Sequence, residues 1–281
     1  MRKILIPTDF SKNSLNAIKY ATELFKHGPT DIYLLHSFYD EVYEAKSSLP
    51  NAVFQDLKDN MMKKKEAELE SLKKEIFSFS PNPKHTLQTI VEFRLLVDSV
   101  NDWVDKENID VVVMGTKGKT SDKLLTFGSN TLQVIKYVKC PVLAIPSGYS
   151  PSTLENILFS TDYMMPYKRR ELRLLSNMAK NFAAHVDFLY VSKFENLSLR
   201  QLDNQAFLEA TFADNHVGFH QIDDEGVAQA INNFIIKKEV DMLVMTNTRH
   251  SYLENILYQS TIEKIGLQID IPFLVLQNLP R

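Results

Sequence analysis

The chain has 281 residues, enough for about two domains of ordinary size. Apolar residues make up 44% and charged residues 24%, which is typical of a globular protein and excludes disordered and fibrous classes. The formal charge of -3 provides no basic surface for nucleic acid, and no apolar run approaches the roughly 18 residues of a membrane span, so neither partner is expected.

The first half predicts alternating strands and helices. Short apolar runs predict strands over residues 3–9, 31–37, 86–91, 110–114 and 140–145. Apolar residues at helical spacing predict helices over residues 11–27, 61–76, 95–107 and 129–138. The run at 110–114 is continuous, as in a parallel strand that is buried on both faces. This order predicts an α/β domain with a parallel sheet.

The second half repeats the same series after a turn-rich linker at residues 146–152. The matching segments are 156–162, 185–191, 227–239, 241–245 and 271–276, while residues 196–215 are shorter and less charged than their counterpart. Residues 3–9 and 156–162 both end in Thr-Asp. We therefore predict two tandem Rossmann-like domains, residues 1–147 and 153–281, each a five-stranded parallel sheet with helices on both faces.

A glycine-containing loop follows the predicted strand at 110–114 and holds three of the eight glycines. The loop and the next predicted helix start contain Gly115, Gly118, Gly128, Ser129 and Asn130. Glycine lets the backbone approach a ligand closely, and N–H groups at a helix N-terminus attract anions. Ligands of open parallel sheets bind beyond the carboxyl ends of the strands, where Asp9 is also expected. The loop therefore predicts a nucleotide site.

Two common phosphate motifs do not fit this loop. Gly118-Lys119-Thr120 matches the end of a P-loop, but Val113 stands where that motif requires its first glycine. The spacing is also not that of a dinucleotide-binding fingerprint. The roles of lysine and threonine in a P-loop are therefore not transferred, although Lys117 or Lys119 could reach a phosphate.

The spacing Gly115-x2-Gly118-x9-Gly128-Ser129 instead resembles the universal stress protein family. Residues 7–11 (Pro-Thr-Asp-Phe-Ser), His36 and residues 114–120 are similar to the family pattern, and the resemblance covers both halves. In ATP-binding members, the loop holds the triphosphate and ribose. The aspartate after the first strand and the backbone at the end of the second hold adenine.

The resemblance implies an adenine nucleotide as the ligand, namely ATP with or without Mg²⁺. The implied binding residues are Pro7, Thr8, Asp9, Ser37, Met114, Gly115, Thr116, Gly118, Gly128, Ser129 and Asn130. Asp9 and Ser37 belong to the base side of this set. Two plainer interpretations stay open, because Asp9 also suits a turn or helix N-cap and the glycines also suit a turn without ligand.

The second half lacks the glycines of this pattern. Ungapped alignment places Thr246, Arg249 and Gln259 at the positions of Gly115, Gly118 and Gly128. Of the motif, only Ser260 and Thr261 are kept, at the positions of Ser129 and Asn130. Three added side chains are expected to block the phosphate path, so we predict nucleotide binding in the first domain only. Asp162 then has only its turn role. Arg249 and His250 suit a solvated loop, with a different anion as the alternative.

The leading functional interpretation is an ATP-binding module of regulation or stress response. No general base is evident near the expected phosphates, so hydrolysis is expected to be slow or absent, and at most that of a weak ATPase. No catalytic residue and no metal ligand is assigned. The seven histidines show no metal-ligand spacing, and His216 and His220 are expected to share a side only in a helix. The lone Cys140 cannot form an internal disulfide, and no apolar leader precedes the first turn, so we expect a cytoplasmic location.

Two alternatives stay open. The first is a nucleotide-independent interaction scaffold, in which the last strands at 142–145 and 273–276 join the halves as a pseudo-dimer, with a homodimer as a further arrangement. The second is an adenylating enzyme of the related nucleotide hydrolases, but residues 7–11 lack the S-G-G-x-D-S type of loop found in that group.

Overall fold

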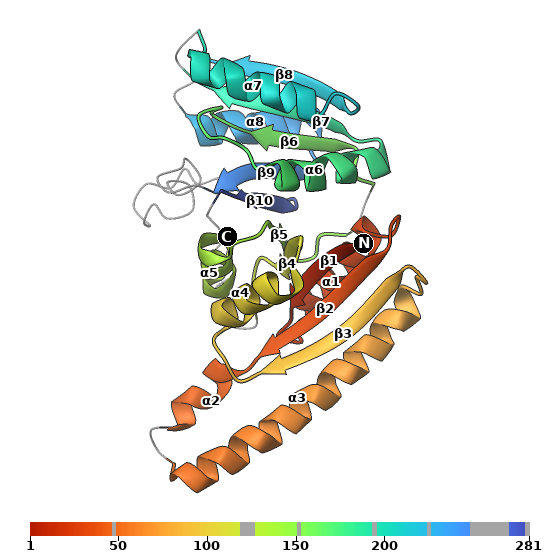
Figure 1. Ribbon diagram of the computed structural model, residues 1–281, viewed down its shortest axis with the longest axis vertical. Helices are drawn as coiled ribbons and strands as arrows, with labels where there is room; N and C mark the ends of the chain where they lie inside the picture. Colours follow the sequence, from red (N-terminus) through yellow and green to blue (C-terminus); the bar gives the residue numbers. More distant parts are fainter. Residues whose placement is uncertain are drawn as a thin grey trace. The chain divides into compact units, whose positions relative to one another are not determined.

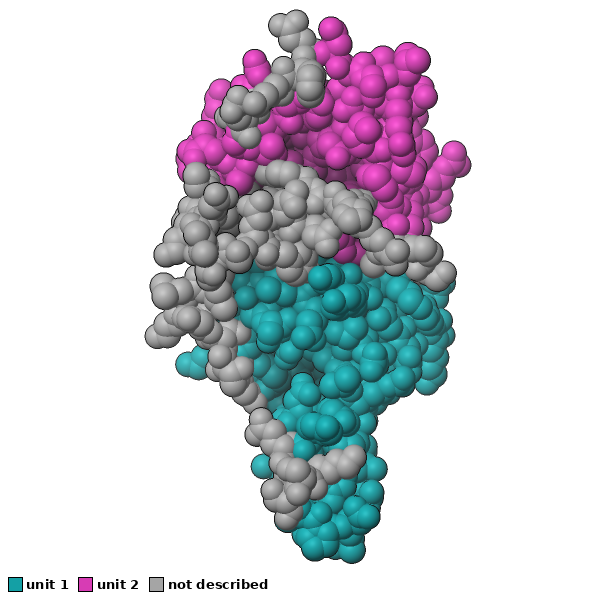
Figure 2. Space-filling model, turned by 90° about the vertical axis from the view of Figure 1, so that its left-hand side faces the viewer, with its two compact units in different colours: residues 1–151 teal, residues 152–281 magenta. Residues whose placement is uncertain are grey.

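The computed structural model describes residues 1–46, 49–118, 127–150, 153–192, 196–223, 226–247 and 270–278. The chain divides into two compact units, residues 1–151 (unit 1) and 152–281 (unit 2), coloured separately in Figure 2. Within the described ranges, no helix has both the length and the apolar character that crossing a membrane requires.

Unit 1 is a parallel sheet with helices on both faces (Figure 1). Its strands are β1 (Arg2–Pro7), β2 (Thr30–Ser37), β3 (His85–Glu92), β4 (Val111–Gly115) and β5 (Val142–Ile145). Its described helices are α1 (Lys12–Leu24), α2 (Tyr39–Lys46), α3 (Asn51–Phe79), α4 (Leu96–Glu107) and α5 (Ser129–Tyr137). The strand order is β3-β2-β1-β4-β5. The order therefore reverses between β1 and β4, where a doubly wound sheet opens a crevice for a ligand.

Unit 2 has the same arrangement in its described part. Its strands are β6 (Asn156–Ser160), β7 (His185–Val191), β8 (His216–Ile222), β9 (Met242–Asn247) and β10 (Phe273–Gln277). Its helices are α6 (Arg169–Phe182), α7 (Leu199–Thr211) and α8 (Val227–Lys238). The strand order is β10-β9-β6-β7-β8, with parallel pairing. The predicted fold class, two Rossmann-like units in tandem, is therefore confirmed.

The turn after the first strand is the same in both units. In unit 1, the Phe10 N–H donates to Thr8 Oγ1 at 3.1 Å, and Phe10 has a φ of 61°. In unit 2, the Tyr163 N–H donates to Thr161 Oγ1 at 3.0 Å, and Tyr163 has a φ of 55°. A bulky aromatic residue rarely takes a positive φ. The positive φ of an aromatic residue in both turns shows that the two units share the backbone conformation of this turn as well as its sequence pattern.

The crossover between β2 and β3 differs from its prediction. The helix expected over residues 61–76 extends over Asn51–Phe79 as α3, and the short helix α2 precedes it (Figure 1). Phe38, Val42 and Phe54 form a buried cluster between α2 and the start of α3. The additional turns of α3 are thus stabilised by packing against α2, which helical spacing over residues 61–76 could not indicate.

Candidate functional site

The carboxyl end of β1 is hydrogen-bonded to β2 and to the start of α1. Pro7 ends the strand and is buried, and the Thr8 N–H donates to Leu35 O of β2 at 2.8 Å. Thr8 Oγ1 donates to Ser14 Oγ at 3.0 Å, while the Ser14 N–H donates to Ser11 Oγ at 3.1 Å. Ser11 is therefore the N-cap of α1, and the hydroxyl groups fix the start of this helix to the end of β1.

Asp9 faces the glycine loop from this turn. Its Oδ1 accepts the Ser11 N–H at 3.0 Å, and a Cβ built on Gly118 would lie 3.2 Å from Asp9 Oδ2. In unit 2, Asp162 Oδ1 accepts the Met164 N–H at 2.9 Å in the same way. Both aspartates thus have the turn role, and Asp9 in addition meets Gly118.

The first part of the glycine loop is attached to α1. Asn13 Nδ2 donates to Lys117 O at 3.2 Å, and Thr131 Oγ1 of α5 donates to Gly115 O at 2.9 Å. A Cβ on Gly115 would lie 3.2 Å from Asn13 O, closer than most side-chain contacts. The missing side chain of Gly115 therefore allows α1 to pack closely against β4.

The end of the loop has its own internal bond. The Gly128 N–H donates to Thr116 O at 2.8 Å, and the N–H of the buried Thr116 donates to Ile145 O at 2.8 Å. Gly128 has a φ of -74°, a value that any residue adopts. Its N–H is already used, so the groups presented at the start of α5 are those of Ser129 and Asn130, which are exposed. Residues 119–126, including Lys119, lie outside the described residues.

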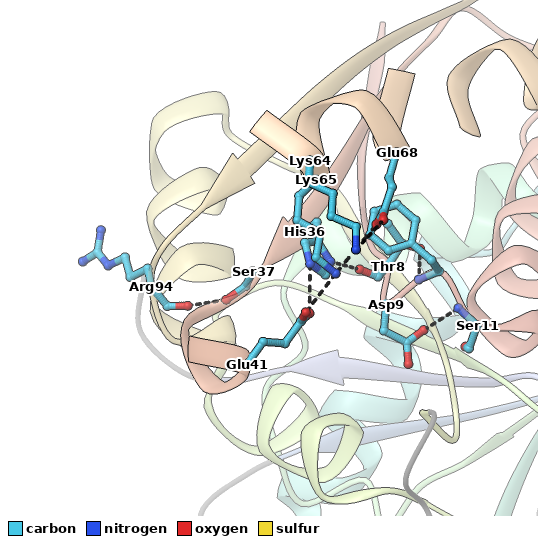
Figure 3. Close-up of polar contacts among 11 residues, drawn as sticks. Thr8, Asp9, Ser11, His36, Ser37, Glu41, Lys64, Lys65, Glu68 and Arg94 are labelled. Atoms are coloured by element: carbon cyan, nitrogen blue, oxygen red, sulfur yellow. Dashed lines mark hydrogen bonds and ion pairs between the residues drawn. The ribbon is translucent and has the colours of Figure 1, made fainter. Parts of the chain in front are cut away.

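Two of the implied residues lie apart from the Asp9–Gly118 contact. The Ser37 hydroxyl donates to Arg94 O, and Figure 3 shows it well separated from Asp9. Met114 is buried in β4, where it pairs with Ala144. The structure therefore brings Asp9 and Gly118 together, while Ser37 and Met114 do not join this contact with their side chains.

A charged cluster beside the site was not predicted. His36 Nδ1 donates to Thr8 O at 2.8 Å, and its Nε2 lies 3.1 Å from Glu41 Oε1. The other Glu41 oxygen lies 2.8 Å from Lys65 Nζ, and this ammonium stands 5.3 Å from the centre of the Phe10 ring (Figure 3). Lys65 is only 6% exposed. It falls on the apolar face of α3 four residues before Leu69, and this position was the available sequence signal.

In unit 2, helix α7 covers the corresponding turn. Gln201 Nε2 donates to Asp162 O at 2.9 Å and to Tyr190 Oη at 3.1 Å. Asn204 Nδ2 donates to Tyr163 O at 2.6 Å. The capping box of Ser198 and Gln201 fixes the first turn of α7 in this place. The carbonyl groups of the turn are therefore already satisfied by side chains.

The sheet register confirms one position of the predicted alignment between the two halves. Gly115 pairs with Ile145 at the end of β4, and Thr246 pairs with Leu276 at the equivalent place in β9. Thr246 thus introduces a side chain where unit 1 has none. The other aligned positions, Arg249, His250, Gln259, Ser260 and Thr261, lie outside the described residues.

The expectation for the histidines of residues 216–222 was wrong. Successive side chains of a strand alternate, so His216 and His220 lie on one face of β8 without helical geometry. On this face, His220 Nε2 lies 2.7 Å and His185 Nε2 lies 3.0 Å from Asp187 Oδ1. Among the described residues, no three histidine, cysteine or acidic side chains are arranged to hold a metal ion.

The parallel strands and covering helices of both units define a tandem α/β protein of the Rossmann-like class, with unit 1 carrying a turn and a glycine loop at the carboxyl ends of β1 and β4. The model of the universal stress protein family matches residues 1–146, more than half of the chain, and the chain belongs to this family.

Two curated relatives are universal stress proteins of Methanocaldococcus jannaschii. MJ0531 is 29% identical over 144 residues, which are 51% of this chain and 81% of that protein. MJ0577 is 26% identical over 156 residues, with 51% of this chain and 94% of that protein covered. A crystal structure of a universal stress protein from Archaeoglobus fulgidus has a TM-score of 0.68 at 19% identity, covering 98% of this chain and 96% of that one. This likeness supports the fold of both units.

Proposed function

We propose that unit 1 binds one adenine nucleotide, ATP with or without Mg²⁺, and that the chain acts as a cytoplasmic regulatory or stress-response module. The observation that carries this proposal is the close approach of Asp9 to Gly118 at the carboxyl ends of β1 and β4, where the strand order reverses. A ligand lying across this edge contacts the turn after β1 and the loop after β4 together.

The turn after β1, the loop after β4 and the start of α5 each supply a different chemical group to the proposed site. The carboxylate of Asp9 accepts hydrogen bonds, which suits the exocyclic amino group of adenine. Gly118 is exposed and carries no side chain, so its backbone is open to a ribose or phosphate. Ser129 and Asn130 open α5, where the N–H groups of the first helical turn and the helix dipole favour anionic oxygens.

The difference between the units supports one nucleotide per chain. Gln201 and Asn204 cover the turn of unit 2, and Thr246 adds a side chain at the position of Gly115. In unit 1, the equivalent α2–α3 segment contributes a charged pair beside the turn, formed by Glu41 and Lys65, and His36 of β2 binds Thr8 O.

Calorimetric titration of the full chain with ATP, in the presence and absence of Mg²⁺, tests this proposal. We expect one site with micromolar affinity, roughly -8 kcal/mol. Gly118→Val should abolish binding, because its side chain would displace the Asp9 carboxylate or occupy the ribose side. The matched control is Gly28→Val, since a Cβ at Gly28 meets no atom within 4 Å. Unchanged affinity in Gly118→Val would remove the loop from the site, and two sites would contradict the assignment to unit 1.

Slow or absent hydrolysis is the second part of the proposal. The groups at the edge are a carboxylate already bonded to the Ser11 N–H, hydroxyl groups and backbone N–H groups. These groups bind and orient a nucleotide, but they provide no strong base to activate water. Phosphate release measured at saturating ATP should stay far below one turnover per minute, and rapid release would contradict this part alone.

A nucleotide-independent scaffold is the alternative, and two observations favour it. Gly115 has a packing role beside Asn13, and the Gly128 N–H is satisfied by Thr116 O. Gly115 therefore has a structural reason that needs no ligand, and the Gly128 N–H is already bonded within the protein. Absence of binding heat at several temperatures would move this alternative to first place. Its own prediction is that residues 142–145 and 273–276 join the two halves.

A further inference from the structure

A groove of about 570 Å³ lies in unit 1 between the start of α1 and the middle of α3. It is lined by the turn after β1, including Thr8 and Phe10, by the first turns of α1 and by one face of α3. Thr8 is the one lining residue that also belongs to the implied nucleotide set. The groove is large enough for a small organic ligand, and α1 and α3 rather than the glycine loop supply its walls.

The groove combines an apolar surface with several ammonium groups. Phe10, Leu15 and Leu72 supply the apolar side chains. Lys64 and Lys65 lie 4.0 and 3.7 Å from the carboxylate of Glu68. One glutamate is therefore shared by two lysines of α3.

A third cation lies on the opposite wall. Lys12 is the first residue of α1, is exposed, and makes no ion pair within the described part of the chain. The partial positive charge of a helix N-terminus adds to its ammonium group. Charge from Lys12 and from the α3 lysines thus faces one space from two helices.

The charge is not uniform along the groove. Lys64 and Glu75 are eleven residues apart on α3, which is about 16 Å along a helix axis. Lys65 also pairs with Glu41 at 2.8 Å, so two glutamates, Glu41 and Glu68, stand against the three lysines. The lysine end therefore keeps one net positive charge, while Glu75 makes the far end acidic. This polarity favours a ligand with a single acidic group at the lysine end, and it disfavours one with acidic groups at both ends.

We propose that this groove is a second ligand site, which binds a small organic anion with an apolar body. The acidic group lies between Lys12 and Lys64, and the body lies against Phe10, Leu15 and Leu72. This site is distinct from the nucleotide site proposed at Asp9 and Gly118, and it does not depend on nucleotide binding.

The test uses 1-anilinonaphthalene-8-sulfonate, an aromatic body with one sulfonate, titrated into the full chain and followed by its fluorescence. We expect saturable binding to one site. The uncharged N-phenyl-1-naphthylamine should bind at least fivefold more weakly, because it lacks the group that the lysines attract. Equal binding of the two probes would show apolar adsorption only and would overturn the proposal, as would the absence of saturable binding.

Lys64→Glu and Lys63→Glu are a matched pair of variants, because both positions lie on α3 but only Lys64 lines the groove. Lys64→Glu should weaken sulfonate binding about tenfold, because it replaces an attraction by a repulsion in a solvated, screened setting. Lys63→Glu makes the same charge change at the neighbouring exposed position, which does not line the groove, and should bind as the original chain does. Equal effects of the two variants would assign the binding to net charge and overturn the site.

Gly118→Val separates this site from the nucleotide site. The variant should keep its affinity for the sulfonate probe whether or not it binds ATP. Loss of probe binding in Gly118→Val, or displacement of the probe by ATP in direct competition, would place the probe at the nucleotide edge and overturn the second site.

Discussion

Gly218→Ala tests how tightly the face of β7 and β8 is packed. A Cβ at Gly218 would lie 2.5 Å from Asp187 Oδ1 and 2.9 Å from His220 Nε2, both far inside a normal contact distance. Asp187 is only 3% exposed, and its Oδ1 accepts hydrogen bonds from His185 and His220. The added methyl group must therefore displace a buried carboxylate from its partners.

The expected cost follows from these bonds. A hydrogen bond to a charged group contributes about 1.5–3 kcal/mol, and the substitution weakens two of them. The cost is reduced because the His185 and His220 side chains are 42% and 32% exposed and regain water. Alanine also gains roughly 0.5–1 kcal/mol over glycine in a strand. We expect a net loss of about 2 kcal/mol in the stability of unit 2.

Hydrogen exchange of the β7 and β8 amides measures this loss without assuming two-state unfolding of the whole chain. Gly28→Ala is the control, because a Cβ at Gly28 has open space around it. In an Asp187→Ala background, Gly218→Ala should cost less than about 0.5 kcal/mol, since the carboxylate is gone and the other close atom, His220 Nε2, ends a part-exposed side chain that can move aside. An undiminished cost in that background would refute the proposed clash with Asp187.

Two further predictions concern a helix cap and alkaline stability. Ser11→Ala should destabilise unit 1 by about 1 kcal/mol in urea denaturation, because the Ser14 N–H loses its acceptor. Ser11→Gly should cost only a few tenths of a kcal/mol. Equal costs of the two variants would contradict the capping role. Burial raises the pKa of the Tyr163 phenol, and a nearby Glu209 charge adds to this effect. The unfolded chain therefore releases this proton near pH 10 while the folded chain keeps it, so stability falls as pH rises above about 10. Tyr163→Phe should make the fall between pH 9 and 11 shallower in urea denaturation, and an unchanged slope would count against this assignment.

Local sequence patterns were sufficient to predict the strands and the tandem repeat. Continuous apolar runs predicted residues 110–114 and 140–145, and the structure has β4 at Val111–Gly115 and β5 at Val142–Ile145. A buried parallel strand must be apolar on both faces, so its signal lies within a few consecutive residues. The recurrence of Thr-Asp likewise indicated a turn that both units share.

Roles that depend on distant partners could not be predicted in this way. The packing of Gly115 depends on the approach of Asn13, about one hundred residues earlier, and the engagement of the Gly128 N–H depends on how the loop closes onto Thr116. The pairing of Glu41 with the buried Lys65 requires α2 and α3 to fold beside β2.

The sequence by itself determined the fold class, the tandem repeat and the two segments that meet at the candidate site, because apolar periodicity and glycine spacing are local properties. Only the tertiary structure decided which groups meet there. It placed Asp9 against Gly118, separated Ser37 from that contact and opened the groove between α1 and α3. These contacts join residues far apart in the chain, and their geometry is set by the packing of helices on the sheet.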